Sequence, residues 1–88
     1  MLTSKELSEL YNKVSSAVWD YNIDYHTSYT CGNDEWNSDY TYVSFEVYGY
    51  NDKTGNSWTE YWGIDSDGKI HTADRTYDSF DAFLSDWR

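Results

Sequence analysis

A strict alternation of side chains between Tyr40 and Tyr50 constrains the fold more than any other feature of the chain. Val43, Phe45 and Val47 stand at every second position, with polar or tyrosine side chains between them. Because successive side chains of a strand point to opposite faces, the segment is predicted to be a half-buried strand. Its apolar face needs a cover from elsewhere in the chain.

The residues that follow predict a hairpin. Asn51–Asn56, with the sequence NDKTGN, is typical of a turn, and Ser57–Ile64 resumes an extended pattern. Pairing of Tyr50 with Ser57 brings Gly49 opposite Trp58, Phe45 opposite Trp62, Val43 opposite Ile64 and Val47 opposite Glu60. Only Glu60 then conflicts with an apolar face. A second turn, Asp65-Ser66-Asp67-Gly68, leads into a short third strand over Lys69–Ala73.

A helix is predicted at the start of the chain. Thr3 and Glu6 have the T-x-x-E spacing of a capping box, and Leu2 and Leu7 that of a hydrophobic staple. The helix is expected to end near Asn22. Its apolar residues recur at steps of three and four and form one stripe, predicted to be core: Leu7, Leu10, Tyr11, Val14, Ala17, Val18 and Tyr21.

The end of the chain predicts a second amphipathic helix, with Asp78 or Ser79 as its N-cap. Its apolar residues follow at i, i+3, i+4 and i+7: Phe80, Phe83, Leu84 and Trp87. The predicted fold class is therefore α+β, in the order N-terminal helix, three-stranded antiparallel sheet, C-terminal helix (αβββα). One layer of helices would cover one sheet face, in a single domain over residues 1–88.

The segment Asn22–Asp39 follows neither period and is rich in Asp, Asn, Ser, Thr and Gly. It predicts a loop that contains at most one short strand. Loops longer than about 12 to 15 residues in compact domains tend to be functional or disordered. Its aromatic residues Tyr25, Tyr29 and Trp36 favour order, so a contact surface is predicted here.

The sheet face opposite the helices is predicted to be exposed. It would carry a set rich in aromatic rings and hydroxyl groups: Tyr42, Glu46, Tyr48, Tyr50, Thr59 and Tyr61. Protein interfaces favour this composition, so the face is a second candidate contact surface.

The charge of the chain limits its partners. Sixteen Asp and Glu against six Lys and Arg give a formal net charge of −10. Such a chain repels nucleic acid and anionic membranes, so neither is expected as a direct partner. The expected partner is a basic protein. Its apolar runs stay far below the roughly 20 residues of a membrane span. With one cysteine and no basic-then-apolar leader, the expected location is the cytoplasm.

One stretch resembles a metal site. Asp65, Asp67, Gly68 and Asp74 match positions 3, 5, 6 and 12 of a calcium loop, but position 1 is Gly63, which cannot ligate. Strands and not helices are predicted on both sides. A tight hairpin turn explains these residues better, and no metal is expected.

Other chemistry has no support in the spacing of the residues. His26 and His71 lie far apart, and a single cysteine, Cys31, allows no C-x-x-C pair. No nucleophile motif and no glycine-rich phosphate loop occurs. Cys31, in the predicted loop, is expected to be a bystander thiol. The chain is predicted to be no enzyme and to bind no cofactor.

Acidic residues concentrate in the predicted loop and turns, where Lys53 is the one base among them: Asp24, Asp34, Glu35, Asp39, Asp52, Asp65 and Asp67. Carboxylates interleaved with aromatic rings can imitate duplex phosphates, which present about one charge per 1.7 Å of axis, and so occupy a basic groove. An acidic surface also keeps small proteins soluble without any special partner, and that interpretation stays open.

In size, charge and mix of helix and sheet, the chain resembles the small acidic inhibitors that phages and mobile elements use against host defence, such as anti-CRISPR and anti-restriction DNA mimics. The resemblance implies blockade of a nucleic-acid-binding enzyme, for example an RNA-guided nuclease, in the cytoplasm of a bacterial host cell. The protein is expected to be a monomer or weak dimer. Carboxylates would meet Arg and Lys, and aromatic rings would serve as anchors. The predicted partner-binding residues are Asp24, Asp34, Glu35, Trp36, Asp39, Tyr42, Glu46, Tyr48, Tyr50, Asp52, Asp65 and Asp67.

Two other classes fit the same features. An immunity protein or antitoxin would use an acidic face for fast, steered association with a basic toxin. The glycine-containing hairpin followed by Asp78-Ser79-Phe80-Asp81-Ala82-Phe83-Leu84 resembles the ending of some SUKH-type immunity proteins, although the chain is shorter than that fold. A structural, self-associating phage module would instead use the tyrosine-bearing face.

Overall fold

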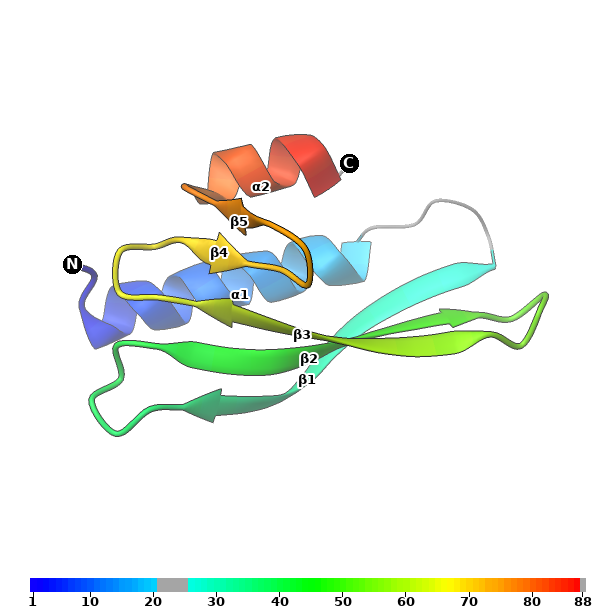
Figure 1. Cartoon of the computed structure of the whole chain (residues 1–88), viewed down its shortest axis with the longest axis horizontal. Coiled ribbons are helices and arrows are strands. Elements are labelled where there is room, and N and C mark those ends of the chain that lie inside the picture. The colour runs from blue at the N-terminus through cyan, green and yellow to red at the C-terminus, as the bar shows by residue number, and fades with distance from the viewer. Residues whose placement is uncertain (21–25, 88) are drawn as a thin grey trace.

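The computed structural model describes residues 1–20 and 26–87 of the chain. Its elements are helix α1 (Ser4–Asp20), strands β1 (Thr27–Trp36), β2 (Val43–Asn51), β3 (Ser57–Ile64), β4 (Ile70–His71) and β5 (Thr76–Tyr77), and helix α2 (Phe80–Trp87) (Figure 1). Neighbouring strands pair antiparallel in the order β1-β2-β3-β4-β5. The α+β class is confirmed, but the predicted three-stranded sheet is wrong, since the described residues form five strands.

The central hairpin, β2 and β3, has the predicted register. Its facing residues are Tyr50 with Ser57, Gly49 with Trp58, Phe45 with Trp62, Val43 with Ile64 and Val47 with Glu60. Glu60 does not stand alone at the apolar face, because Trp62 Nε1 donates to its Oε1 at 3.4 Å. The hairpin therefore follows from the alternation of the sequence.

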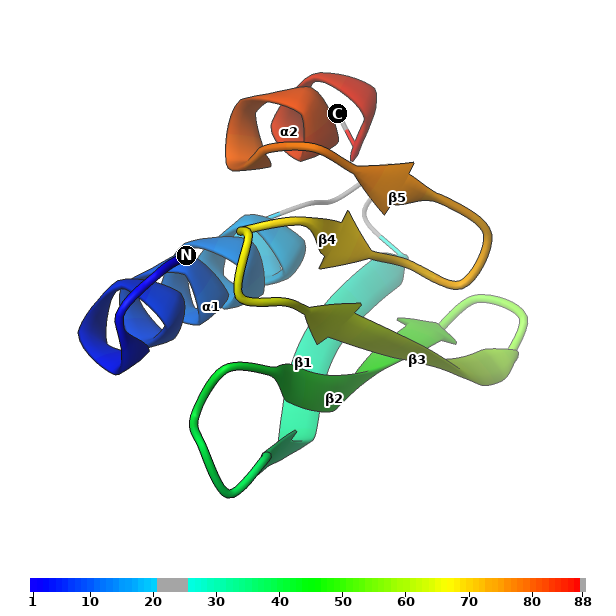
Figure 2. The same cartoon turned by 60° about the vertical axis from the view of Figure 1, so that its left-hand side comes forward.

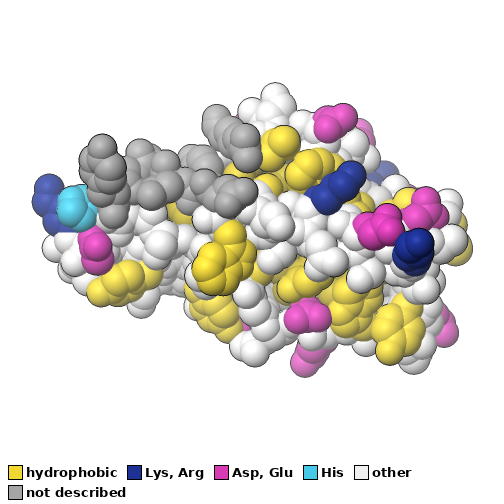
Figure 3. Space-filling model, turned by 180° about the vertical axis from the view of Figure 1, so that it is seen from behind, with side chains coloured by type: hydrophobic (Ala, Val, Ile, Leu, Met, Phe, Trp, Pro, Cys, Tyr) yellow, Lys and Arg dark blue, Asp and Glu magenta, His cyan; other side chains and the backbone are white. Residues whose placement is uncertain are grey.

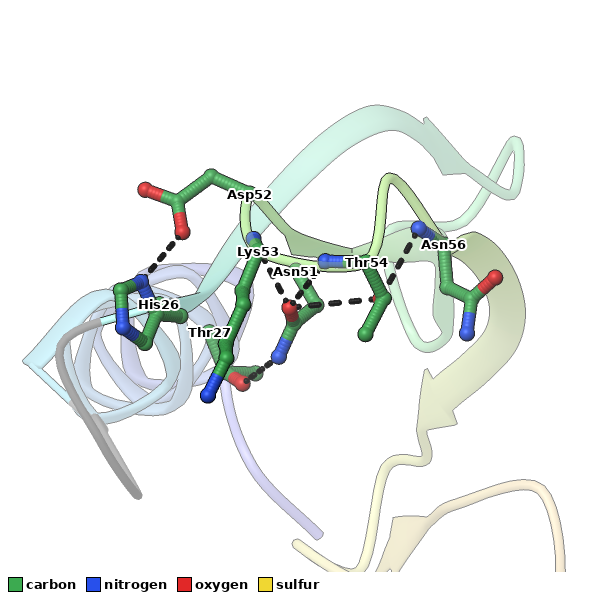
Figure 4. A network of polar contacts seen from close by, with 7 residues as sticks. All are labelled: His26, Thr27, Asn51, Asp52, Lys53, Thr54 and Asn56. Atoms are coloured by element: carbon green, nitrogen blue, oxygen red, sulfur yellow. Dashed lines mark hydrogen bonds and ion pairs between the residues drawn. The ribbon is translucent and has the colours of Figure 1, made fainter.

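Asn51 holds the turn between β2 and β3 (Figure 4). Its Oδ1 accepts the backbone N–H groups of Lys53 and Thr54, each at 3.0 Å. Its Nδ2 donates to Thr27 Oγ1 on β1 at 2.9 Å. Gly55 has a φ of 77°, a left-handed geometry that glycine adopts without strain. The predicted turn is confirmed, and one side chain ties it to the neighbouring strand.

The loop predicted over residues 22–39 is wrong for Thr27–Trp36, which is strand β1. Thr27 and Tyr29 are buried while Ser28 between them is exposed, as in a half-buried strand. β1 pairs with β2 over almost the whole length of both strands. Its core-facing positions include a threonine and a cysteine, so it lacks the clean apolar alternation of β2.

The third predicted strand, Lys69–Ala73, is shorter than expected. β4 covers only Ile70 and His71, because the chain turns back with a hydrogen bond of 2.8 Å from the Thr72 N–H to the Arg75 carbonyl. β5 follows and pairs with β4. Two residues are too few to show an alternating pattern, so the sequence does not predict β5.

The capping box of α1 is confirmed in both directions. The backbone N–H of Thr3 donates to Glu6 Oε1 at 3.0 Å, and the N–H of Glu6 donates to Thr3 Oγ1 at 3.1 Å. Among the predicted stripe, Leu7, Val14 and Val18 are fully buried. The predicted helix end near Asn22 and the stripe residue Tyr21 lie outside the described residues.

Both helices cover the same face of the sheet (Figure 2). Tyr11 of α1 meets Phe45 edge-on, with ring centroids 5.0 Å apart. Phe83 and Trp87 of α2 meet Trp62, the residue opposite Phe45, at 5.6 Å and 5.3 Å. The predicted single helical layer is therefore present, and neither α1 nor α2 lies over the opposite face. Neither of these helices is long and apolar enough to cross a membrane.

Candidate acidic interaction surface

The sheet face away from the helices carries the predicted tyrosines. Tyr61 is 71% exposed and Tyr50 is 47% exposed. Tyr42 and Tyr48 are partly covered because each ring lies over a glycine of a neighbouring strand. A Cβ on Gly63 would meet the Tyr42 hydroxyl, and one on Gly32 would meet Tyr48 Cε2 at 3.3 Å. This face, called here the outer face, combines exposed rings with rings held flat against the sheet.

A β-bulge shapes the outer face at β1. From Gly32 to Glu35 the register advances three residues on β1 against two on β2, so one residue is extra. Asn33, within the bulge, has a φ of 52°, which asparagine tolerates better than most residues. Its Nδ2 donates to Glu46 Oε2 at 2.8 Å and to the Tyr48 hydroxyl oxygen at 2.7 Å. The Tyr48 hydroxyl also donates to Glu46 Oε2, so this carboxylate is fixed in place.

The bulge brings three carboxylates around one open cavity of about 540 Å³. We call it the acidic hollow. Within the described residues, 1–20 and 26–87, no lysine or arginine lines it, and its residues are Asn33, Asp34, Glu35, Ser44, Phe45, Glu46 and Tyr61. Glu35 faces Ser44, which stands two residues before Glu46 on β2, so the Glu35 and Glu46 side chains belong to the same face of the sheet. Neither Glu35 nor the nearby Asp39 has a side-chain partner among the described residues, so both carboxylates are available.

A second cavity, of about 470 Å³, lies beside the hollow and shares Asp34 with it. Its walls are the rings of Tyr11, Trp36 and Tyr40 and the first turns of α1. Trp36 Nε1 donates to Asp34 Oδ2 at 2.9 Å, which holds the carboxylate against the rings. Burial, then the charge of Asp34 and Cys31, raise the pKa of Tyr11 to about 12, so its hydroxyl stays protonated.

The other predicted acids are spread over the molecule. Asp67 belongs to the β3–β4 turn, at the same end of the sheet as Asp39. Asp52 lies at the opposite end, where its Oδ1 is 2.7 Å from His26 Nδ1 (Figure 4). Asp24 lies outside the described residues. Among the described members of the predicted set, the hollow joins Asp34, Glu35 and Glu46.

Asp65 is engaged within its own turn. Its Oδ1 accepts the backbone N–H groups of Asp67 and Lys69, and its Oδ2 is 2.9 Å from His71 Nε2. Burial raises its pKa, but these hydrogen bonds and the histidine together outweigh burial and lower it. Asp65 therefore acts as a turn residue whose carboxylate is already satisfied.

Sequence reasoning placed Tyr61 on the second candidate contact surface, but it did not name Asn33, Tyr11 or Tyr40 as candidate contacts. Asn33 follows Gly32, and a Gly-Asn pair inside a polar stretch is a signal for a bulge or a left-handed residue. No sequence signal brings Tyr11 to the end of β1, since that contact depends on how α1 packs.

Burial raises the pKa of Cys31 to about 11, which keeps this thiol protonated.

Charged side chains lie in separate groups on the side of the molecule opposite to that of Figure 1, with lysine or arginine beside some of the acids (Figure 3). Among the described residues, no group of three His, Cys, Asp or Glu side chains could hold a metal ion.

Comparison of the chain with protein-family models, with curated proteins and with solved structures found no match.

Proposed function

We propose that this protein is an acidic inhibitor that binds the basic nucleic-acid-binding surface of a host-defence nuclease, of the anti-CRISPR or anti-restriction type, and blocks DNA binding by mimicry. One observation carries the proposal. Three carboxylates line a single open cavity on the outer face, and no basic side chain among the described residues lines it with them.

The charges of the hollow suit a basic groove. Glu46 is oriented by Asn33 and Tyr48, whereas Glu35 has no partner among the described residues. A carboxylate held in one orientation loses little entropy when it meets arginine, and a free one can adapt to lysine. The formal net charge of −10 adds long-range attraction that speeds encounter at low salt.

The exposed tyrosine rings add contact area to the attraction between charges. Tyr61 lines the hollow and is 71% exposed, and Tyr42 is 39% exposed on the same face. Tyrosines in the centre of an interface often carry much of its free energy, since they bury large area with few rotatable bonds. The proposed interface is therefore centred on the hollow, with Tyr61 as its anchor.

Competition with DNA tests this function. Purified protein is titrated against an RNA-guided nuclease bound to labelled duplex DNA, over a series of salt concentrations. We expect displacement of the DNA, with an affinity that falls as salt rises. An affinity that is indifferent to salt, or absence of displacement from a panel of such nucleases and restriction enzymes, contradicts the proposal. Retention of a basic toxin from host lysate would replace it by the immunity-protein alternative.

A charge-reversal variant localises the interaction. Asp34→Lys, Glu35→Lys and Asp39→Lys together should weaken nuclease binding far more than Glu9→Lys, Asp74→Lys and Asp78→Lys together. Both triple variants change the net charge equally, and the residues of the control set are all exposed and lie away from the hollow. Equal losses would mean that the overall field, and no particular surface, drives binding.

Self-association is a second candidate, which the exposed rings of Tyr50 and Tyr61 favour. Light scattering coupled to size exclusion distinguishes the two. A dimer that Tyr61→Ser converts to monomer would support self-association through the outer face, whereas a monomer at all concentrations counts against it.

A further inference from the structure

The cavity between α1 and the end of β1 has walls unlike those of the acidic hollow. Three aromatic rings surround it, and Asp34 reaches into it. Trp36 meets Tyr11 edge-on with centroids 5.9 Å apart, and it meets Tyr40 at 6.0 Å with a tilt of 34°. Tyr40 leaves 56% of its surface exposed, so a ring face remains open to an incoming group. We call this cavity the aromatic pocket.

The turn before β2 holds Tyr40 in a costly conformation. Tyr40 has a φ of 54°, which is rare for a bulky side chain and costs on the order of a factor of ten in folding equilibrium. Asn37 enforces it: Asn37 Oδ1 accepts the N–H groups of Thr41 and Tyr42 at 2.8 Å and 2.9 Å, and the Asn37 carbonyl accepts the Tyr40 N–H at 3.0 Å. The turn thus presents a large ring at the pocket where a smaller residue would be less strained.

Asp34 gives the pocket a negative charge that no ion pair among the described residues neutralises. Its Oδ2 accepts the Trp36 indole N–H, and its Oδ1 has no partner among the described residues. Lys5 also lines the pocket, yet no ion pair joins Lys5 to Asp34 in the part of the chain that the structure describes. A cation from outside can therefore meet one free carboxylate oxygen and an open ring face at once.

We infer that the aromatic pocket receives an arginine side chain of the partner protein. Arginine fits better than lysine because its planar guanidinium can stack on the face of Tyr40 while its N–H groups donate to Asp34. A strongly hydrated ammonium group would gain less from the rings. The inference rests on the proposed function only in taking the partner to be basic, and it names the side chain that the partner would insert.

Small probes test the pocket without any nuclease. The full chain is titrated with N-acetyl-arginine amide and with its neutral isostere N-acetyl-citrulline amide, and the indole N–H signals of the five tryptophans are followed by NMR. The Trp36 signal is assigned with Trp36→Phe. We expect arginine to shift the Trp36 signal and to bind about tenfold more tightly than citrulline, as a charge-assisted hydrogen bond implies.

Single substitutions sharpen the result. Asp34→Asn should remove most of the preference for arginine, whereas Asp74→Asn, which deletes one exposed carboxylate between β4 and β5, should leave it unchanged. Lys5→Gln should tighten arginine binding, because it removes a like charge from the pocket wall. Tyr40→Asn should weaken arginine binding without loss of fold stability, since asparagine tolerates the left-handed conformation. Loss of binding with retained stability separates a binding role of this ring from a structural one.

The outcomes separate the two proposals. Equal binding of arginine and citrulline, or an arginine effect that misses Trp36, overturns the pocket inference and leaves the DNA competition to decide the function. Arginine binding at Trp36 without displacement of DNA from any nuclease overturns the proposed function and keeps the pocket.

Discussion

Replacement of Gly49 by alanine should destabilise the sheet, because an aromatic ring occupies the place of the missing side chain. A Cβ on Gly49 would lie 2.1 Å from Trp58 Cε2 and 2.3 Å from its Cζ2. These atoms belong to the body of the indole, so the whole ring must move. Trp58 also meets Tyr29 edge-on at 5.9 Å, and that contact would be lost as well.

The expected magnitude follows from this geometry. Forcing a methyl group into a filled site costs about 1–3 kcal/mol, of which the Tyr29 contact accounts for about 0.5–1.5 kcal/mol. In a Trp58→Ala background the conflict disappears. Alanine is then favoured over glycine within a strand by about 0.5–1 kcal/mol, so the sign of the Gly49→Ala effect should reverse. The coupling between the two positions is therefore expected to be about 1.5–4 kcal/mol.

Urea denaturation of the four proteins of this cycle measures the coupling. Unfolding is followed by far-UV circular dichroism, since loss of Trp58 changes the fluorescence, and the slopes are compared to verify two-state behaviour. Gly32→Ala is the control on the neighbouring strand, because its Cβ would be 3.3 Å from Tyr48 Cε2 and needs only a small adjustment. An equal loss of stability from Gly49→Ala with and without Trp58 would refute the steric explanation.

Three further outcomes are expected. Thr3→Ala should destabilise the protein by about 1 kcal/mol in the same urea assay, because it removes the N-cap of α1. The pKa of Asp65 is lowered in the folded state, so its contribution to stability is complete above its ordinary value of 3.8 and is lost as pH falls through the lowered value. Asp65→Asn should therefore be less stable than the parent at neutral pH, and the difference should shrink below about pH 4 in acid denaturation. Cys31, with its pKa raised to about 11 by burial, should react with iodoacetamide at neutral pH much more slowly in the folded protein than in urea, as followed by mass spectrometry.

Local patterns were sufficient for much of the fold. The alternation of Val43, Phe45 and Val47 predicted not only a strand but the register of the whole hairpin, because a slip of one residue would turn every apolar side chain outwards. The capping box of Thr3 and Glu6 marked the start of α1 for a similar reason, since its spacing serves one geometry only.

β1 escaped prediction for physical reasons. An edge strand pairs on one side only, so its core-facing positions tolerate a threonine at 27 and a cysteine at 31. The bulge then shifts the period within the strand, and Asn33 and Asp34 read as loop residues. Bulges at an edge also discourage pairing with other chains, so the feature that hid this strand is one that edge strands commonly use.

The candidate surface depends on the same bulge. Clustering of acids in the polar segment predicted Asp34 and Glu35, but their position beside Glu46 requires the β1–β2 pairing. The contact of Tyr11 with Trp36 requires the docking of α1 onto that strand. The residues of this surface come from α1, β1 and β2. Because they are far apart in the sequence, their spacing forms no motif that predicts the site.

The acidic residues fall into two groups, those with a partner inside the fold and those without one among the described residues. Substitutions in the two groups should have opposite effects on stability. Several carboxylates are engaged within the fold: Glu6 with Thr3, Glu46 with Asn33 and Tyr48, Asp52 with His26, Asp65 with His71, and Asp86 with Arg75. Neutralising one of these removes a charge-assisted hydrogen bond or ion pair within the fold, so stability should fall modestly. Glu35 and Asp39 have no such partner among the described residues, and their removal should relieve repulsion in a chain of net charge −10. An acid whose removal stabilises the fold does not serve stability. Variants that are more stable than the parent but no longer bind the partner would therefore identify the acids that serve binding.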